Sequence, residues 1–266
     1  MPASIEWQGA DGTRDDAGAN YRWRGLEWPS NTHRPPANLN GAVAMARWID
    51  LDTPHGPVRA WRAEPGGPSK GAVLVIQEIF GVNAHIRSVT ERFAAAGFVA
   101  LAPALFDPVE PGVELRYEQA DFGRGRALVA ALGVERAVDV LGVAAGVLQD
   151  EGLRVGAAGF CWGGTLAFLS NTRLGLPAAC YYGARTIPFL DERARAPLMF
   201  HFGERDDSIP ASDIALHRQQ QPLAQVFVYP EAGHAFNRDV DPGAHEPASA
   251  ALAWQRTIDF LAEALQ

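Results

Sequence analysis

Cysteine is scarce in this sequence, and long apolar runs are absent. The 266 residues contain two cysteines, which gives no basis for the disulfide framework of a small secreted domain. No stretch approaches the roughly 18 apolar residues that suggest a transmembrane helix. Residues 1–6 lack the charged and apolar regions of a secretory signal, so the expected location is the cytoplasm and no membrane partner is expected.

Basic residues are fewer than acidic residues. The chain has 23 lysines and arginines against 31 aspartates and glutamates, a net charge of −8. This balance argues against nucleic acid and anionic membranes as partners. An anionic substrate would be repelled at long range, so local arginines would have to attract it. With 47% apolar residues, the chain can still bury a sizeable core.

From about residue 45, runs of strand length alternate with stretches of helical spacing, without internal repeats or low-complexity tracts. The expected strands are 45–52, 58–62, 72–76, 98–102, 153–158, 198–202 and 225–229. The expected helices are 84–96, 114–132, 134–150, one starting at 164–169, and 248–265. This alternation predicts an α/β domain over residues 45–266, with a mostly parallel sheet and helices on both faces.

Residues 159–163 read Gly-Phe-Cys-Trp-Gly, a nucleophile-elbow frame with a thiol where the common form has a hydroxyl. The frame places Cys161 on a sharp turn between a strand and a helix. Gly159 and Gly163 suit that turn because a side chain would collide there. A cysteine in such a place can instead be a small buried hydrophobe, and Cys180 is expected to be one. The flanking glycines favour catalysis for Cys161.

A triad of this type continues along the chain with an acid and then a histidine. Asp206 and Asp207 lie in an acidic turn after one expected strand, and His234 follows the next. Open α/β sheets place their sites beyond the carboxyl ends of strands, which is where these residues fall. One of the two aspartates is expected to orient the imidazole and the other to form a turn or cap a helix. Structural or surface roles are expected for His33, His55, His85, His201, His217 and His245.

Glu78 directly follows the buried run at residues 73–76. A carboxylate at that position is costly unless it has a partner, and the alternative is a solvated acid in a turn.

Five segments together resemble, in order, the dienelactone hydrolase (carboxymethylenebutenolidase) family. They are residues 77–83, 159–164, 181–183, 203–210 and 233–238. The resemblance extends from about residue 46 to the C-terminus. It implies an α/β-hydrolase fold for residues 45–266.

The resemblance also implies roles for individual residues. It implies a triad of Cys161, Asp206 and His234, with Asp206 chosen because it precedes Pro210 by four positions. It implies that Glu78 contacts the resting thiol and helps to ionise it when substrate arrives. The substrate carboxylate would be held by Arg238 and by a second arginine. Candidates for the latter are Arg116, Arg124 and Arg126, with Arg124 as the working choice, and Tyr182 would also contact substrate. No metal and no cofactor are implied.

The chemistry of these residues is consistent with ester or lactone hydrolysis. A free thiol is mostly protonated at neutral pH and needs a base or a positive neighbour, which His234 can provide while Asp206 fixes its tautomer. The backbone N–H groups of Ile79 and Trp162 are the expected oxyanion donors. Ring opening of a lactone would leave an acyl-thioester that water hydrolyses.

Residues 1–44 extend beyond the family's usual start. This segment is rich in prolines and carries the large aromatics Trp7, Tyr21, Trp23 and Trp28. One interpretation is an arm whose aromatics pack on the domain surface, and the other is a cover for the active-site mouth or a partner subunit.

Three functions are compatible with the sequence. The first is a hydrolase that opens an unsaturated lactone bearing a carboxylate. The second is a thiol-dependent esterase or thioesterase acting on another small ester. The third is a non-catalytic binding protein with a hydrolase fold, against which the complete set of Glu78, Cys161, Asp206 and His234 argues.

Overall fold

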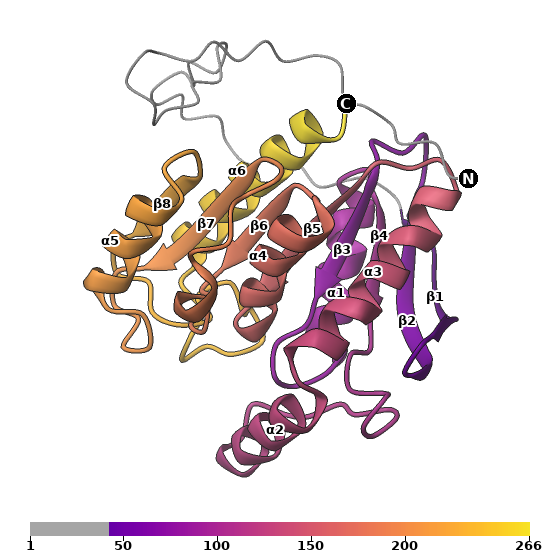
Figure 1. The fold of residues 1–266 in the computed structure, drawn as a ribbon, viewed down its shortest axis with the longest axis horizontal. Coiled ribbons are helices and arrows are strands. Elements are labelled where there is room, and N and C mark those ends of the chain that lie inside the picture. The colour runs from indigo at the N-terminus through magenta and orange to yellow at the C-terminus, as the bar shows by residue number, and fades with distance from the viewer. Residues whose placement is uncertain (1–42) are drawn as a thin grey trace. The chain divides into compact units, whose positions relative to one another are not determined.

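The computed structural model describes residues 43–266, and the expectations for the aromatic-rich segment lie almost wholly outside them. The described residues form one eight-stranded sheet in the order β1-β2-β4-β3-β5-β6-β7-β8 (Figure 1). The pairs β1–β2 and β2–β4 are antiparallel and all other neighbours are parallel. The strands are β1 (Val43–Thr53), β2 (Gly56–Pro65), β3 (Ala72–Ile76), β4 (Val99–Pro103), β5 (Val155–Phe160), β6 (Ala178–Tyr181), β7 (Leu198–Gly203) and β8 (Gln225–Tyr229).

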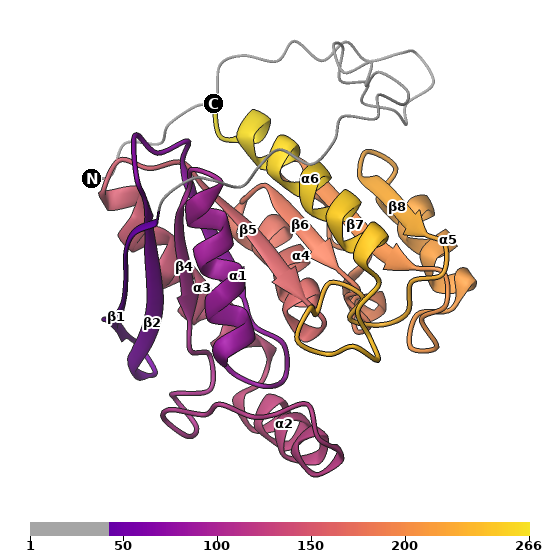
Figure 2. The same ribbon diagram turned by 180° about the vertical axis from the view of Figure 1, so that it is seen from behind.

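Helices cover both faces of the sheet, as the alternation in the sequence predicted. The helices α3, α4 and α5 lie on the face turned to the viewer in Figure 1, and α1 and α6 lie on the face seen in Figure 2. The helix α2 lies beyond one end of the sheet in both views. The helices are α1 (Ala84–Ala95), α2 (Gln119–Leu132), α3 (Val134–Asp150), α4 (Trp162–Leu174), α5 (Ala211–Gln220) and α6 (Pro247–Ala264), with a short 3₁₀ turn, η1 (Ile187–Phe189).

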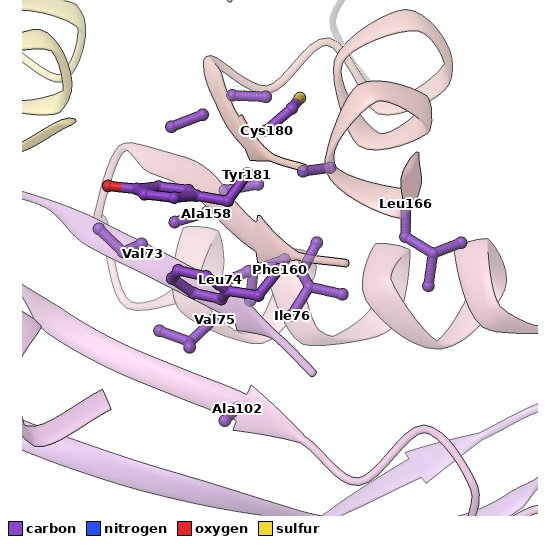
Figure 3. Packing of buried hydrophobic residues seen from close by; sticks show 14 of the residues in the cluster. Val73, Leu74, Val75, Ile76, Ala102, Ala158, Phe160, Leu166, Cys180 and Tyr181 are labelled. Carbon is purple, nitrogen blue, oxygen red and sulfur yellow. The ribbon is translucent and has the colours of Figure 1, made fainter. Parts of the chain in front are cut away.

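The core lies on both sides of the central strands. Every residue of β3, β4, β5, β6 and β7 is buried, which explains their nearly continuous apolar sequences. Figure 3 shows the side chains of β3 with Phe160 of β5 and Tyr181 of β6 in this core. Each fully buried aliphatic side chain of this kind stabilises the fold by about 1.5–3 kcal/mol relative to its exposed state. Elements that end at this core are therefore firmly anchored.

The start of the helix predicted for residues 114–132 is wrong. Helix α2 begins only at Gln119, because the preceding residues pair with the loop after β3. Glu114 forms an isolated antiparallel bridge with Gly81, and the Leu115 N–H donates to the Phe80 carbonyl at 2.8 Å. These tertiary hydrogen bonds hold the chain extended where its local composition favours a helix.

Local signals set both ends of α1, and the sequence predicted the stop at Gly97. The Asn83 side chain accepts a hydrogen bond from the Ile86 N–H at 3.2 Å and caps the N-terminus of α1. Gly97, just past the C-cap residue Ala96, has a φ of +99°. A residue with a side chain would be strained there, so the helix stops at this glycine.

Candidate active site

The elbow that the sequence predicts lies between β5 and α4. Cys161 has φ 55° and ψ −118°, a backbone conformation that non-glycine residues rarely adopt. Its N–H donates to the Tyr181 carbonyl at 3.0 Å, and its own carbonyl accepts from the Gly164 N–H at 2.9 Å. A strained residue of this kind costs about 1–3 kcal/mol and persists because its surroundings hold it. The strain leaves Cys161 half-buried at the carboxyl end of β5.

The elbow requires glycine on both sides of Cys161, because neighbouring backbone segments lie too close to leave room for a Cβ. A Cβ on Gly159 would lie 1.8 Å from the Gly163 carbonyl oxygen, and one on Gly163 would lie 2.3 Å from the Ile76 carbonyl oxygen. The sequence predicted this crowding for the turn. It brings the elbow directly against the end of β3, from which Glu78 and Ile79 follow.

The structure joins His234 to Asp206 and leaves Asp207 out. The His234 Nδ1 lies 2.7 Å from Asp206 Oδ2, and the Asp206 side chain is fully buried. The other oxygen of Asp206 accepts from the Ser208 N–H at 2.8 Å, which fixes the carboxylate. Asp207 is exposed in the same turn. Of the two aspartates, only Asp206 orients the imidazole.

The environment makes His234 an unusually strong base. Burial alone would lower its pKa, but the hydrogen bond to Asp206 and the proximity of Cys161 outweigh burial and raise the pKa to about 10. At neutral pH the imidazole therefore holds a proton next to the thiol. A protonated imidazole in that position stabilises a thiolate.

Glu78 and Arg238 form a buried ion pair at the same end of the sheet. Arg238 Nη2 donates to Glu78 Oε1 at 2.7 Å, and both side chains are at most 5% exposed. The expected hydrogen bond between Glu78 and the resting Cys161 thiol is not found among the described residues, because Oε1 is taken by Arg238 and Oε2 has no partner. Arg238 also pairs with Asp241 at 3.1 Å. Its guanidinium lies 4.1 Å from the ring centroid of Tyr117 and 5.4 Å from that of Phe80. Burial raises the pKa of Glu78, but the charge of Arg238 more than compensates, so the pKa is lowered and Glu78 is ionised.

Three polar atoms near this pair have no partner among the described residues. They are Glu78 Oε2, Arg238 Nε and the Tyr182 hydroxyl, all of them buried. The Tyr182 ring lies edge-on to the His234 ring, with centroids 5.2 Å apart. Buried polar groups without partners are unusual and mark places where a ligand can supply the missing hydrogen bonds. Tyr182 and Arg238, both predicted to bind substrate, therefore lie in one region with His234.

A family model described as "Dienelactone hydrolase family" matches residues 58–265, most of the chain. The chain belongs to the dienelactone hydrolase family. The carboxymethylenebutenolidase of Pseudomonas putida is 33% identical over 210 residues, which cover 74% of this chain and 89% of the relative. A candidate carboxymethylenebutenolidase of Salmonella typhimurium is 32% identical over 262 residues, covering 88% and 92% of the two chains.

Solved structures agree with this assignment. The structure of a candidate dienelactone hydrolase from Klebsiella pneumoniae superposes with a TM-score of 0.73 at 28% identity, covering 84% of this chain and 99% of the other. The fold is therefore the α/β-hydrolase fold, and the protein is a hydrolase acting on ester bonds. The third function considered above, a non-catalytic binding protein, is not supported.

In this dienelactone hydrolase family member, the three arginines in and before α2 are exposed to solvent. Arg124 is exposed and pairs with Glu110, and Arg116 is exposed and pairs with Glu118 at 3.2 Å. Arg126 is exposed as well. Within residues 43–266 none of the three makes a polar contact with a triad residue. A second arginine for a substrate carboxylate therefore stays a prediction without a geometric counterpart.

Within residues 43–266, the two expected oxyanion donors have free N–H groups. Neither the Ile79 nor the Trp162 N–H donates to an acceptor in the part of the chain that the structure describes. Trp162 is the first residue of α4, where N–H groups have no partner within the helix. Its indole is stacked on Phe106, with ring centroids 5.7 Å apart and an interplanar angle of 12°. Stacking fixes Trp162 and hence the start of the helix.

Sequence reasoning missed Tyr117 as a member of the site. It is half-buried in the extended segment before α2, and its hydroxyl accepts from the Asn83 side-chain amide at 3.1 Å. No pattern around residue 117 indicates this role, because it depends on the pairing between that segment and the loop after β3.

Over residues 43–266, no helix is both long and apolar enough to cross a membrane. No group of three or more potential metal-ligating side chains occurs in that same range.

Proposed function

We propose that this protein opens an unsaturated lactone that carries a carboxylate, of the dienelactone to maleylacetate type, with Cys161, His234 and Asp206 as a catalytic triad. The observation that carries the proposal is the His234–Asp206 hydrogen bond of 2.7 Å together with a His234 pKa raised in part by the Cys161 thiol. A strained thiol, a fixed imidazolium and a buried carboxylate are the parts that thiol-dependent acyl transfer needs.

The first half of the reaction transfers the acyl group to sulfur. The Cys161 Sγ attacks the lactone carbonyl carbon while its proton resides on His234. The resulting oxyanion accepts hydrogen bonds from the Ile79 and Trp162 N–H groups. The ring C–O bond then breaks, and His234 gives its proton to the departing enol oxygen. An enol is a good leaving group, so the intermediate collapses forward to the thioester rather than back to the thiolate.

The second half restores the enzyme. Water attacks the thioester carbonyl and transfers a proton to His234 as the C–S bond breaks. The product is the ring-opened acid, and the thiolate–imidazolium pair is regenerated. Asp206 holds the imidazole in one tautomer through both halves.

Arg238 and Glu78 give the site its preference for an anionic substrate. A substrate carboxylate near Arg238 competes with Glu78 for the guanidinium, and the unpartnered Arg238 Nε offers it a further donor. Release of Glu78 from Arg238 leaves a buried carboxylate whose negative charge stabilises the protonated form of His234, which favours transfer of the thiol proton to His234.

A thiol-dependent esterase or thioesterase acting on another small ester is the second candidate. It is favoured by the pairing of Arg238 with two carboxylates, Glu78 and Asp241. The exposure of Arg124 and its pairing with Glu110 favour it too. A single arginine whose charge is already neutralised by protein carboxylates would attract a substrate carboxylate only weakly.

The experiment that tests the proposal compares two substrates on three proteins. A dienelactone and a neutral aryl ester are offered to the unmodified protein, to Cys161→Ala and to Arg238→Ala. We expect Cys161→Ala to be inactive on both and Arg238→Ala to lose the lactone far more than the aryl ester. Aryl ester activity without lactone activity in the unmodified protein would support the second candidate, and residual activity of Cys161→Ala above a few per cent would refute the nucleophile.

A further inference from the structure

Helix α2 makes a close backbone contact with the loop that carries the Ile79 N–H. Gly125 is buried on this helix, and a Cβ there would lie 2.3 Å from the Ile79 carbonyl oxygen and 3.2 Å from Ile79 Cγ1. Real Cβ atoms do not approach a backbone oxygen so closely. Only glycine lets the helix rest directly on the Ile79 carbonyl.

The same loop is held on its other side by the buried side chain of Gln77. Gln77 Nε2 donates to the Glu78 carbonyl at 3.2 Å, and Gln77 Oε1 accepts from the Leu105 N–H at 3.0 Å. The Glu78 carbonyl and the Ile79 N–H belong to one planar peptide group. A hydrogen bond that fixes the carbonyl therefore fixes the direction of the N–H, and it also polarises that N–H as a donor.

Aromatic packing also holds the loop after β3. The Phe80 ring lies edge-on between Tyr117 and Phe122, with centroid distances of 4.8 Å and 5.0 Å. Phe122 lies on α2, one turn before Gly125. The loop is thus held by α2 and by Gln77, whose side chain is hydrogen-bonded to the loop after β4.

We propose that Gln77 and Gly125 are positioning residues for the oxyanion donor, which hold the Ile79 N–H in the direction that stabilises the tetrahedral intermediate. Gln77 sets the peptide plane that contains the N–H, and Gly125 prevents the next peptide from rotating. This inference rests on the proposed function, because it takes Cys161 as the nucleophile and the Ile79 N–H as a donor.

The test separates attack by the thiol from stabilisation of the oxyanion. Alkylation of Cys161 by iodoacetamide displaces iodide at a saturated carbon and develops no oxyanion, whereas turnover of an aryl ester requires one. The proteins compared are the unmodified chain, Gly125→Ala, and Gly123→Ala as a matched control on the same helix. Gly123 is exposed, and a Cβ there meets nothing within 4 Å.

We expect Gly125→Ala to lower kcat for the aryl ester by about 10-fold or more, since loss of one oxyanion donor costs on the order of 10²–10³ in kcat. Its rate of alkylation at Cys161 should stay within about 2-fold of the unmodified protein by the same argument, and Gly123→Ala should change neither rate. An unchanged kcat, or a parallel loss of turnover and alkylation, would overturn the inference.

Gln77→Met provides an independent arm if Gly125→Ala does not fold. It removes the donor to the Glu78 carbonyl at similar side-chain volume, and the same split between turnover and alkylation is expected; a kcat equal to that of the unmodified protein would overturn the inference. Failure of the proposed function gives a different pattern. In that case Cys161→Ala, or protein fully alkylated at Cys161, would still hydrolyse the ester.

Discussion

At the scale of single residues, the charge state of His234 depends on both other members of the proposed triad. Its pKa is raised to about 10 against the effect of burial, by Asp206 first and by the Cys161 thiol second. Cys161→Ala removes the second contribution and keeps the first. We therefore expect the pKa of His234 to be lower in Cys161→Ala than in the unmodified protein, as followed by NMR titration of labelled histidine. An identical titration of His234 in both proteins would mean that the thiol and imidazole do not interact.

Glu78 offers a second prediction at this scale. Glu78→Gln keeps an oxygen that can accept from Arg238 Nη2, so the protein should fold, but it removes the negative charge that stabilises protonated His234. We expect kcat for the lactone to fall by more than KM rises. Asp241→Asn, which changes the half-buried partner of Arg238, serves as a comparison and should have the smaller effect on kcat. A turnover number unchanged in Glu78→Gln would remove Glu78 from the mechanism.

The backbone turn at the proposed nucleophile was predictable from the sequence, because a short motif specifies it. Cys161 lies in an elbow whose glycines are required by backbone contacts of 1.8 Å and 2.3 Å, so the local sequence encodes the turn. The role of Gln77 could not be predicted in the same way. Its two hydrogen bonds reach Glu78 and Leu105, and the second depends on the loop after the neighbouring strand β4.

At the scale of secondary-structure elements, a buried polar network joins α6 to the sheet. His201 of β7 lies 2.8 Å from the Tyr229 hydroxyl through Nδ1 and 3.0 Å from Thr257 Oγ1 through Nε2. The Tyr181 hydroxyl lies 2.6 Å from the same threonine oxygen. Burial lowers the pKa of His201 to about 3, so the ring is neutral in the folded protein. The network anchors the helix that follows the His234 loop.

This network predicts a pH dependence of stability. Between pH 6.5 and about 3, His201 binds a proton in the unfolded chain and not in the folded one, so the free energy of unfolding falls as the pH falls. The slope from one such group is about 1.4 kcal/mol per pH unit. His201→Phe should be less stable at pH 7, because two hydroxyls lose a partner, and should show a shallower decline between pH 6.5 and 4 in urea denaturation. Equal pH slopes for the two proteins would contradict the assignment.

Element boundaries were predictable where local signals set them and not where tertiary contacts did. Gly97 ends α1 because its φ of +99° excludes side chains, a local requirement visible in the sequence. The start of α2 is set instead by the pairing of Glu114 with Gly81, which no local pattern reports. That pairing also carries Tyr117 to Arg238, so the same missed contact explains both the wrong boundary and the missed site residue.

At the scale of the whole molecule, the net charge of −8 opposes the approach of an anionic substrate. Salt screens this repulsion over a Debye length of about 10 Å at 0.1 M. We expect kcat/KM for a carboxylate-bearing lactone to rise as the ionic strength rises from about 10 mM to about 100 mM, while kcat/KM for a neutral aryl ester stays constant. A decrease for the lactone over the same range would show that the local field of Arg238 dominates the approach.

The most direct test of the account is to trap the acyl group on Cys161. A reaction with the lactone is quenched in acid during turnover, and the protein is digested and examined by mass spectrometry. Because a lactone's leaving group stays attached to its acyl group, we expect an adduct with the full mass of the lactone on the peptide that contains Cys161, and none in Cys161→Ala. Turnover without an adduct at Cys161, or with an adduct at another residue, would contradict it.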